Sequence, residues 1–73
     1  MRTLADLKLG EKATIESFTD DYMSLKLLEM GCLPETSVEL CSKAPLGDPI
    51  CIKVSDYQLS LRVEEASTVI VKA

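Results

Sequence analysis

The chain has 73 residues, which is enough for one small domain with a marginal core and too few for a large catalytic cleft with its own scaffold. Apolar residues make up 47% of the sequence and exclude a disordered chain. The 12 acidic and 8 basic residues give a net charge of -4, which argues against binding to nucleic acid or to an anionic membrane surface.

Several common functional signals are missing. Histidine is absent, which removes the commonest general base and the commonest zinc ligand. The N-terminus carries charges at Arg2, Asp6 and Lys8 without an apolar signal core, and no apolar run approaches the roughly 20 residues of a membrane span. We therefore expect a single domain over residues 1–73, cytoplasmic, with no catalytic residue, no metal site and no cofactor.

The first elements expected are a lead-in and a strand. Residues 4–9 place three leucines around a short turn that packs onto the core, with room for one helical turn (Leu4, Leu7 and Leu9). The next segment, residues 11–18, alternates between apolar and polar side chains, with Ala13 and Ile15 facing inward. Such alternation is typical of a half-buried strand.

An amphipathic helix is predicted near Tyr22–Met30. Its start is marked by side chains that can cap a helix N-terminus, namely Thr19, Asp20 and Asp21. One face gathers Met23, Leu27 and Met30, widened by Leu28, whereas Leu25 falls on the polar side with Lys26 and Glu29. Gly31 follows the helix, and glycine suits the positive φ that the chain often adopts directly after a helix.

After Gly31 the period of the apolar residues changes from 3.6 to 2, which predicts strands. Alternating stretches occupy residues 38–44, 50–54, 57–61 and 68–72, and residues 64–66 suit one helical turn. Turns are expected at residues 44–49 and at Ser55-Asp56. The expected core contains Ile15, Leu27, Met30, Val38, Leu40, Ile52, Leu59, Leu61 and Val69, together with Val71.

The order of elements is strand, helix and four further strands joined by short turns. Many short strands in so small a chain favour a closed or nearly closed barrel, because closure removes exposed strand edges. The helix would then cover one open end.

Three stretches in this order resemble the FeoA-type domain of ferrous iron transport proteins. They are Lys26-Leu27-Leu28-Glu29-Met30-Gly31 with Leu33-Pro34, then Ala44-Pro45-Leu46-Gly47-Asp48-Pro49-Ile50, then Leu59-Ser60-Leu61-Arg62 with Glu65-Ala66. The opening Leu4, Leu7 and Gly10 fit the same pattern. The similarity extends from Leu4 to Val71.

The resemblance implies a mainly β fold, a small SH3-like β-barrel of about five strands with one short helix between the first and second strands. It also implies a small cytoplasmic accessory protein, not an enzyme, whose partner is the cytoplasmic GTPase region of a FeoB-type ferrous iron transporter. Weak self-association is compatible with such a domain.

The sequence departs from the family pattern at two turns. Glu35 stands where the family often has glycine after the proline, so we expect a turn that avoids positive φ there. Ser55-Asp56 replaces another turn glycine, and Asp56 is the residue expected to tolerate positive φ.

The candidate partner-binding residues lie in loops, outside the periodic pattern of the predicted core residues. They are Leu33, Pro34, Leu46, Gly47 and Pro49. Apolar side chains on rigid, proline-bounded loops lose little entropy on binding, and the two loops would form one site if they lie close together. The acidic surface adds an expected preference for a basic partner patch.

The cysteines are the remaining candidates for chemistry. Cys41 and Cys51 would share the outer face of a hairpin, either directly opposite or as diagonal neighbours. Free thiols are the favoured interpretation, with a cross-strand disulfide or a soft-metal site as alternatives; Cys32 is expected to pack as a small apolar group. Besides the accessory function, a generic SH3-like peptide-binding or oligomerisation module and a metal carrier stay open.

Overall fold

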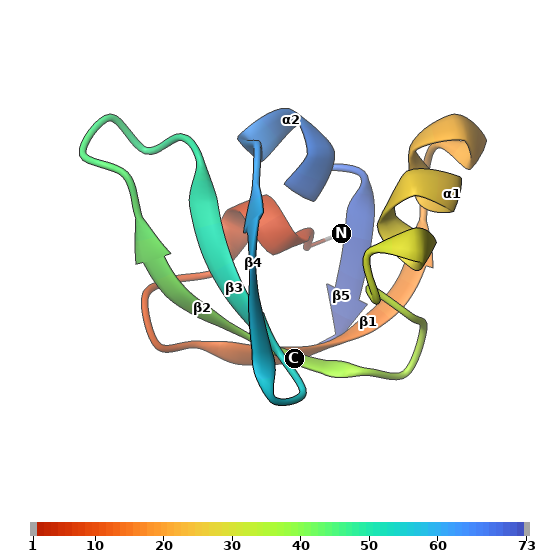
Figure 1. Ribbon diagram of the computed structural model, residues 1–73, viewed down its shortest axis with the longest axis horizontal. Coiled ribbons are helices and arrows are strands. Elements are labelled where there is room, and N and C mark those ends of the chain that lie inside the picture. Colours follow the sequence, from red (N-terminus) through yellow and green to blue (C-terminus); the bar gives the residue numbers. More distant parts are fainter. Residues whose placement is uncertain (1, 73) are drawn as a thin grey trace.

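The computed structural model describes residues 2–72 and confirms a mainly β protein with one principal helix (Figure 1). The sheet has five antiparallel strands in the order β4-β3-β2-β1-β5. In chain order the elements are a 3-10 turn (Leu4–Asp6), β1 (Lys12–Phe18), α1 (Asp21–Glu29), β2 (Ser37–Lys43), β3 (Ile50–Val54), β4 (Tyr57–Leu61), α2 (Val63–Ala66) and β5 (Val69–Lys72).

The sheet curls around the core without closing. Figure 1 shows β4 and β5 at its two edges, and no ladder joins these strands within residues 2–72. The register shifts between Ile15 and Ser17 and between Leu40 and Ser42, and such irregularities increase the local bend of a strand. The result is a nearly closed, barrel-like sheet of the expected kind.

The core is formed by the inward residues of the strands, by Leu27 of α1 and by the lead-in. Most of the predicted core residues are buried, whereas Met30 and Leu59 are only half-buried against the cluster. Leu4 and Leu7 are buried as expected, but Leu9 is 66% exposed and does not belong to the core. Ile70 is buried as well, because the N-terminal segment covers the outer side of β5 at the Thr3–Ile70 bridge.

Helix α1 begins and ends one residue earlier than predicted and has the predicted buried face. The Asp20 carboxylate accepts a hydrogen bond from the Met23 N–H at 3.0 Å, which satisfies one free donor of the first turn. Gly31 ends the segment with a φ of +99°. Leu27 is fully buried and Leu25 is 64% exposed, so the face was assigned correctly.

Two turns adopt backbone conformations that differ from those expected. Glu35 has a φ of 68°, although we expected the chain to avoid positive φ at this residue. In the β3–β4 hairpin, Ser55 rather than Asp56 takes the positive φ, at 56°. A positive φ at the first turn residue alone is the pattern of a type II′ turn, which matches the twist of the two strands.

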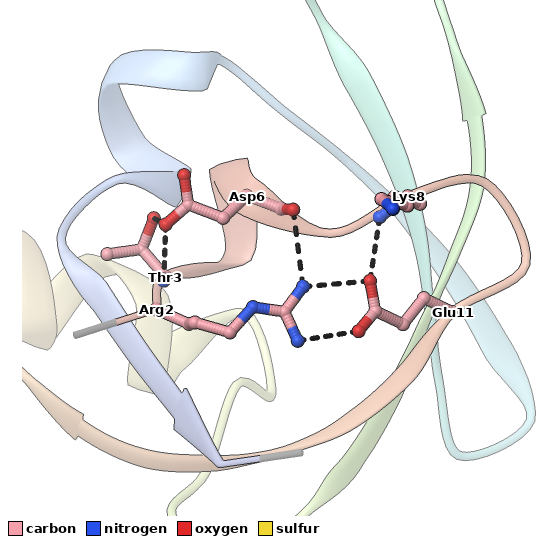
Figure 2. Close-up of polar contacts among 5 residues, drawn as sticks. All are labelled: Arg2, Thr3, Asp6, Lys8 and Glu11. Carbon is pink, nitrogen blue, oxygen red and sulfur yellow. Dashed lines mark hydrogen bonds and ion pairs between the residues drawn. The ribbon is translucent and has the colours of Figure 1, made fainter.

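The lead-in is held to the sheet by a network of polar contacts around Glu11 (Figure 2). Arg2 donates two hydrogen bonds to the Glu11 carboxylate, at 2.6 and 2.8 Å, and the Lys8 N–H donates a third at 2.9 Å. The hydrogen bonds from Arg2 and Lys8 lower the pKa of Glu11 to about 2. This network fixes the segment that covers β5.

Candidate functional site

The structure places the candidate contact residues on two separate surfaces. Leu46, Gly47 and Pro49 lie on the loop between β2 and β3, with the Leu46 side chain 97% exposed. Leu33, which is 50% exposed, and Pro34 lie on the connection between α1 and β2. Figure 1 shows the β2–β3 loop at the upper left and the α1–β2 connection at the lower right, so the two loops do not form one patch.

The β2–β3 loop is held in a defined shape by its own backbone. The Ala44 N–H donates to the Pro49 carbonyl at 3.0 Å, and the Gly47 N–H donates to the Ala44 carbonyl at 2.7 Å. Gly47 has a φ of 88°, a conformation that glycine adopts without strain. Leu46 is therefore presented to solvent by a short, ordered loop with little conformational freedom left to lose on binding.

A groove of about 440 Å³ opens beside this loop. The helices and β4 contribute most of its lining, which includes Lys26 of α1, the α1 C-cap Met30, Ser60 of β4, Arg62 and Glu65 of α2. Asp48 and Pro49 of the β2–β3 loop complete the lining. Sequence analysis identified Pro49 as a contact residue but did not predict that α1, α2, β4 and the loop converge around it.

An ion pair joins the two helices across the groove. The Glu65 carboxylate contacts Lys26 Nζ and accepts a hydrogen bond from the Arg62 N–H at 3.0 Å. These contacts, first of all the hydrogen bond from Lys26, lower the pKa of Glu65, which is 7% exposed. Glu65 thus carries a negative charge that Lys26 neutralises within the groove wall.

The other two charged residues of the groove, Asp48 and Arg62, differ in whether another group of the chain bonds to them. Asp48 Oδ1 accepts a hydrogen bond from the Val63 N–H at 3.0 Å, which caps the first turn of α2. Arg62 forms no ion pair with any residue from 2 to 72. Arg62 is therefore the groove cation without a direct ion pair in this range, although its charge also helps to lower the pKa of Glu65 and the Asp48 carboxylate lines the same groove.

All three cysteines have free thiols. The shift in register between β2 and β3 places Cys51 opposite Ser42 and leaves Cys41 without a partner in the ladder. Of the two arrangements that the sequence left open, direct opposition of Cys41 and Cys51 is therefore excluded. Cys32 is fully buried, as expected, and its burial raises the pKa of the thiol. Burial and a raised pKa both make this thiol less reactive than an exposed one.

Across residues 2–72, no cluster of three or more cysteine, aspartate or glutamate side chains has the geometry to hold a metal ion. No helix in the same range is long and apolar enough to cross a membrane.

Fold and surface together define a small SH3-like β-barrel that presents a rigid loop and a groove, the features of a binding module. The family model described as the FeoA domain matches residues 2–73, and the chain belongs to this family. A crystal structure of Stenotrophomonas maltophilia FeoA complexed with zinc, described as an SH3 domain protein, is 31% identical with a TM-score of 0.86, covering 99% of this chain and 91% of that one.

Two further relatives support the assignment. A FeoA-like protein from Clostridium acetobutylicum, solved by NMR, is 30% identical with a TM-score of 0.89, covering 96% of this chain and 83% of that one. A fusion protein of Fe(2+) transport protein A and the Fe(2+) transporter FeoB from Porphyromonas gingivalis is 33% identical over 67 residues, which cover 90% of this chain. The chain spans 8% of the length of that fusion protein.

Proposed function

We propose that this chain is a small cytoplasmic accessory protein of ferrous iron uptake that binds the cytoplasmic GTPase region of a FeoB-type transporter. The observation that carries the proposal is the fusion relative, in which a FeoA-type segment and the transporter share one polypeptide. Joining two modules in one chain raises their effective concentration for each other and is useful when they act together. Here the FeoA-type domain would supply the same contact as a separate protein.

The β2–β3 loop is the proposed docking surface. Leu46 is 97% exposed at the tip of a loop fixed by two backbone hydrogen bonds, and an exposed, preorganised apolar side chain is suited to enter a pocket on a partner. Gly47 and Pro49 hold the shape of the loop and take part in the same surface. Leu33 and Pro34 lie on the distant α1–β2 connection and would serve as a second, separate contact.

Electrostatics add a second expectation for the complex. The chain carries a net charge of -4, so a partner patch rich in lysine or arginine would be steered toward it. Salt screens such steering over a Debye length of about 8 Å at physiological ionic strength. Association should therefore slow as the salt concentration rises, whereas the apolar contact of Leu46 governs dissociation.

The test is a binding measurement with the purified cytoplasmic region of the transporter and reduced thiols. Leu46→Asp should weaken binding while the domain stays folded, and Leu25→Asp, at a leucine of α1 that is 64% exposed, is the matched control that should not. Equal binding by parent and Leu46→Asp would remove the loop as the docking surface. No binding by the parent would reject the function and favour the peptide-binding module or the metal carrier, which a ferrous iron titration separates.

A further inference from the structure

Strand β4 has an edge that the rest of the described chain leaves free. β4 pairs with β3 alone, whereas the opposite edge of the sheet, at β5, is covered by the N-terminal segment, where the Val71 N–H donates to the Arg2 carbonyl at 3.0 Å. The segment Tyr57–Leu61 has no charged residue and no proline to protect this edge. An unprotected edge is a template for another strand.

The backbone groups on this edge follow from the register of the hairpin. Val54 and Tyr57 flank a two-residue turn and pair with each other, so they exchange both ladder hydrogen bonds. The pairs alternate along the ladder, and the N–H and C=O groups of Gln58 and Ser60 therefore point away from β3. Neither residue's backbone forms a hydrogen bond elsewhere in residues 2–72.

The groove reaches this edge at Ser60, the one residue of β4 that lines it. Lys26 of α1 and Met30, the residue that caps the C-terminus of this helix, line the groove as well. In the view of Figure 1, α1 stands to the right of β4 and α2 lies above it. The Tyr57 hydroxyl donates a hydrogen bond to the Met30 carbonyl at 3.2 Å, which ties the end of α1 to the start of β4.

We propose that the groove binds an extended acidic peptide segment, which adds to the sheet as a sixth strand on β4. The backbone of Gln58 and Ser60 supplies the hydrogen bonds, as in other cases of strand addition. The guanidinium of Arg62 pairs with an aspartate or glutamate side chain of the segment, because Lys26 is already neutralised by Glu65. Met30 and Pro49 provide apolar surface for a neighbouring side chain of the segment.

A single strand fits the groove better than the edge of a second copy. Lys26 of α1 lines the same groove as Ser60 of β4, so a whole sheet laid alongside β4 would meet this helix. The edge is also short: β4 has 5 residues, or about 17 Å of strand, and a contact of this length buries far less than the roughly 1,600 Å² of a standard stable interface. Peptide binding here does not depend on the Leu46 tip and goes beyond the docking function.

The experiment is an NMR titration of the full ¹⁵N-labelled chain with a blocked peptide of alternating strand-forming residues, acetyl-Thr-Val-Glu-Val-Thr-Val-amide. The same peptide with lysine in place of glutamate tests the charge, and a version with methylated backbone nitrogens tests the hydrogen bonds. Saturable shifts are expected at the amides of Gln58 and Ser60. Arg62→Gln should weaken binding of the glutamate peptide about threefold and leave the lysine peptide unaffected.

A proline at the free edge gives the sharper variant. The Ser60 N–H points away from β3, so Ser60→Pro removes an outward donor and leaves the ladder to β3 intact. We expect Ser60→Pro to weaken peptide binding about fivefold relative to Ser60→Ala. Should Ser60→Pro unfold, the methylated peptide makes the same test on the parent chain.

Three results would overturn the proposal. The first is the absence of shifts at Gln58 and Ser60 with all three peptides. The second is equal binding of the methylated and unmethylated peptides. The third is a change of these signals with protein concentration alone, which would assign the edge to a second copy of the chain. Binding of the transporter region by Ser60→Pro with unchanged affinity would leave the docking function standing, so the two proposals fail separately.

Discussion

Glu35 offers the clearest test of the backbone geometry. It follows Pro34 with a φ of 68°, in the left-handed region that costs an L-residue about 1–2 kcal/mol. Glycine avoids this cost but loses more backbone entropy on folding, by about 0.5–1 kcal/mol. Within residues 2–72, the side chain of Glu35 forms one ion pair, an exposed contact with Lys72 at 3.3 Å, and such pairs contribute about 0–1 kcal/mol.

The informative comparison is between Glu35→Gly and Glu35→Ala. Both variants lose the contact with Lys72, and only the glycine relieves the strained φ. We expect Glu35→Gly to be more stable than Glu35→Ala by about 1 kcal/mol, or about 4–8 °C in melting temperature for a domain of this size. Thermal and urea unfolding followed by circular dichroism would measure the difference.

The β3–β4 turn supplies a matched control. Ser55 has a φ of 56°, and Asp56 beside it does not have a positive φ. The glycine variant should therefore be more stable than the alanine variant at position 55 but not at position 56. A glycine variant at position 35 that is less stable than the alanine variant would refute the left-handed geometry there and the reasoning that follows from it.

Three further predictions concern the core, the acid response and the docking loop. Leu27→Ala should lower the free energy of unfolding by about 2–5 kcal/mol, because Leu27 is fully buried. Leu25→Ala, at a residue that is 64% exposed, should change it by less than about 0.5 kcal/mol. An equally small loss at Leu27 would mean that the buried face of the helix is assigned wrongly. The pKa of Glu11 is lowered to about 2 in the folded chain, so its stabilising contribution is complete above about pH 4.5 and is lost as the pH falls toward 2. Glu11→Gln should flatten the dependence of melting temperature on pH in that window, and an unchanged slope would contradict the role of the Arg2 contact. The association rate with the transporter region should fall with added salt in both the parent and Leu46→Asp, and a rate independent of salt would remove the electrostatic steering.

The elements and the core of this fold could be predicted from local patterns. The periods of 3.6 and 2 identified the helix and the strands, and Leu25 was correctly separated from Leu27 because the two fall on opposite faces. Met30 and Leu59 were predicted to be fully buried and are only half-buried. Periodicity predicts the direction in which a side chain points but not how completely neighbouring segments bury it. The prediction that Leu9, at the end of the lead-in, packs onto the core was wrong for the same reason.

The groove could not be predicted because it depends on contacts between distant segments. Lys26 and Glu65 are 39 residues apart, and no local pattern indicates that Glu65 is the buried partner of a lysine in α1. The irregularity between Leu40 and Ser42 decides against direct opposition of Cys41 and Cys51, an alternative that the sequence had left open. Pro49 was identified from its loop, but only the fold shows that it lines a groove beside a free strand edge.

The central claim is that this domain acts by binding a protein partner through the β2–β3 loop. The most direct test is an NMR titration of the ¹⁵N-labelled chain, thiols reduced, with the cytoplasmic region of a FeoB-type transporter. The account predicts saturable changes centred on the amides of Leu46 and Gly47. No change at any residue would contradict the binding function. Changes confined to Lys12, Glu39 and Lys53, which line a separate surface depression on the sheet, would contradict the assigned surface.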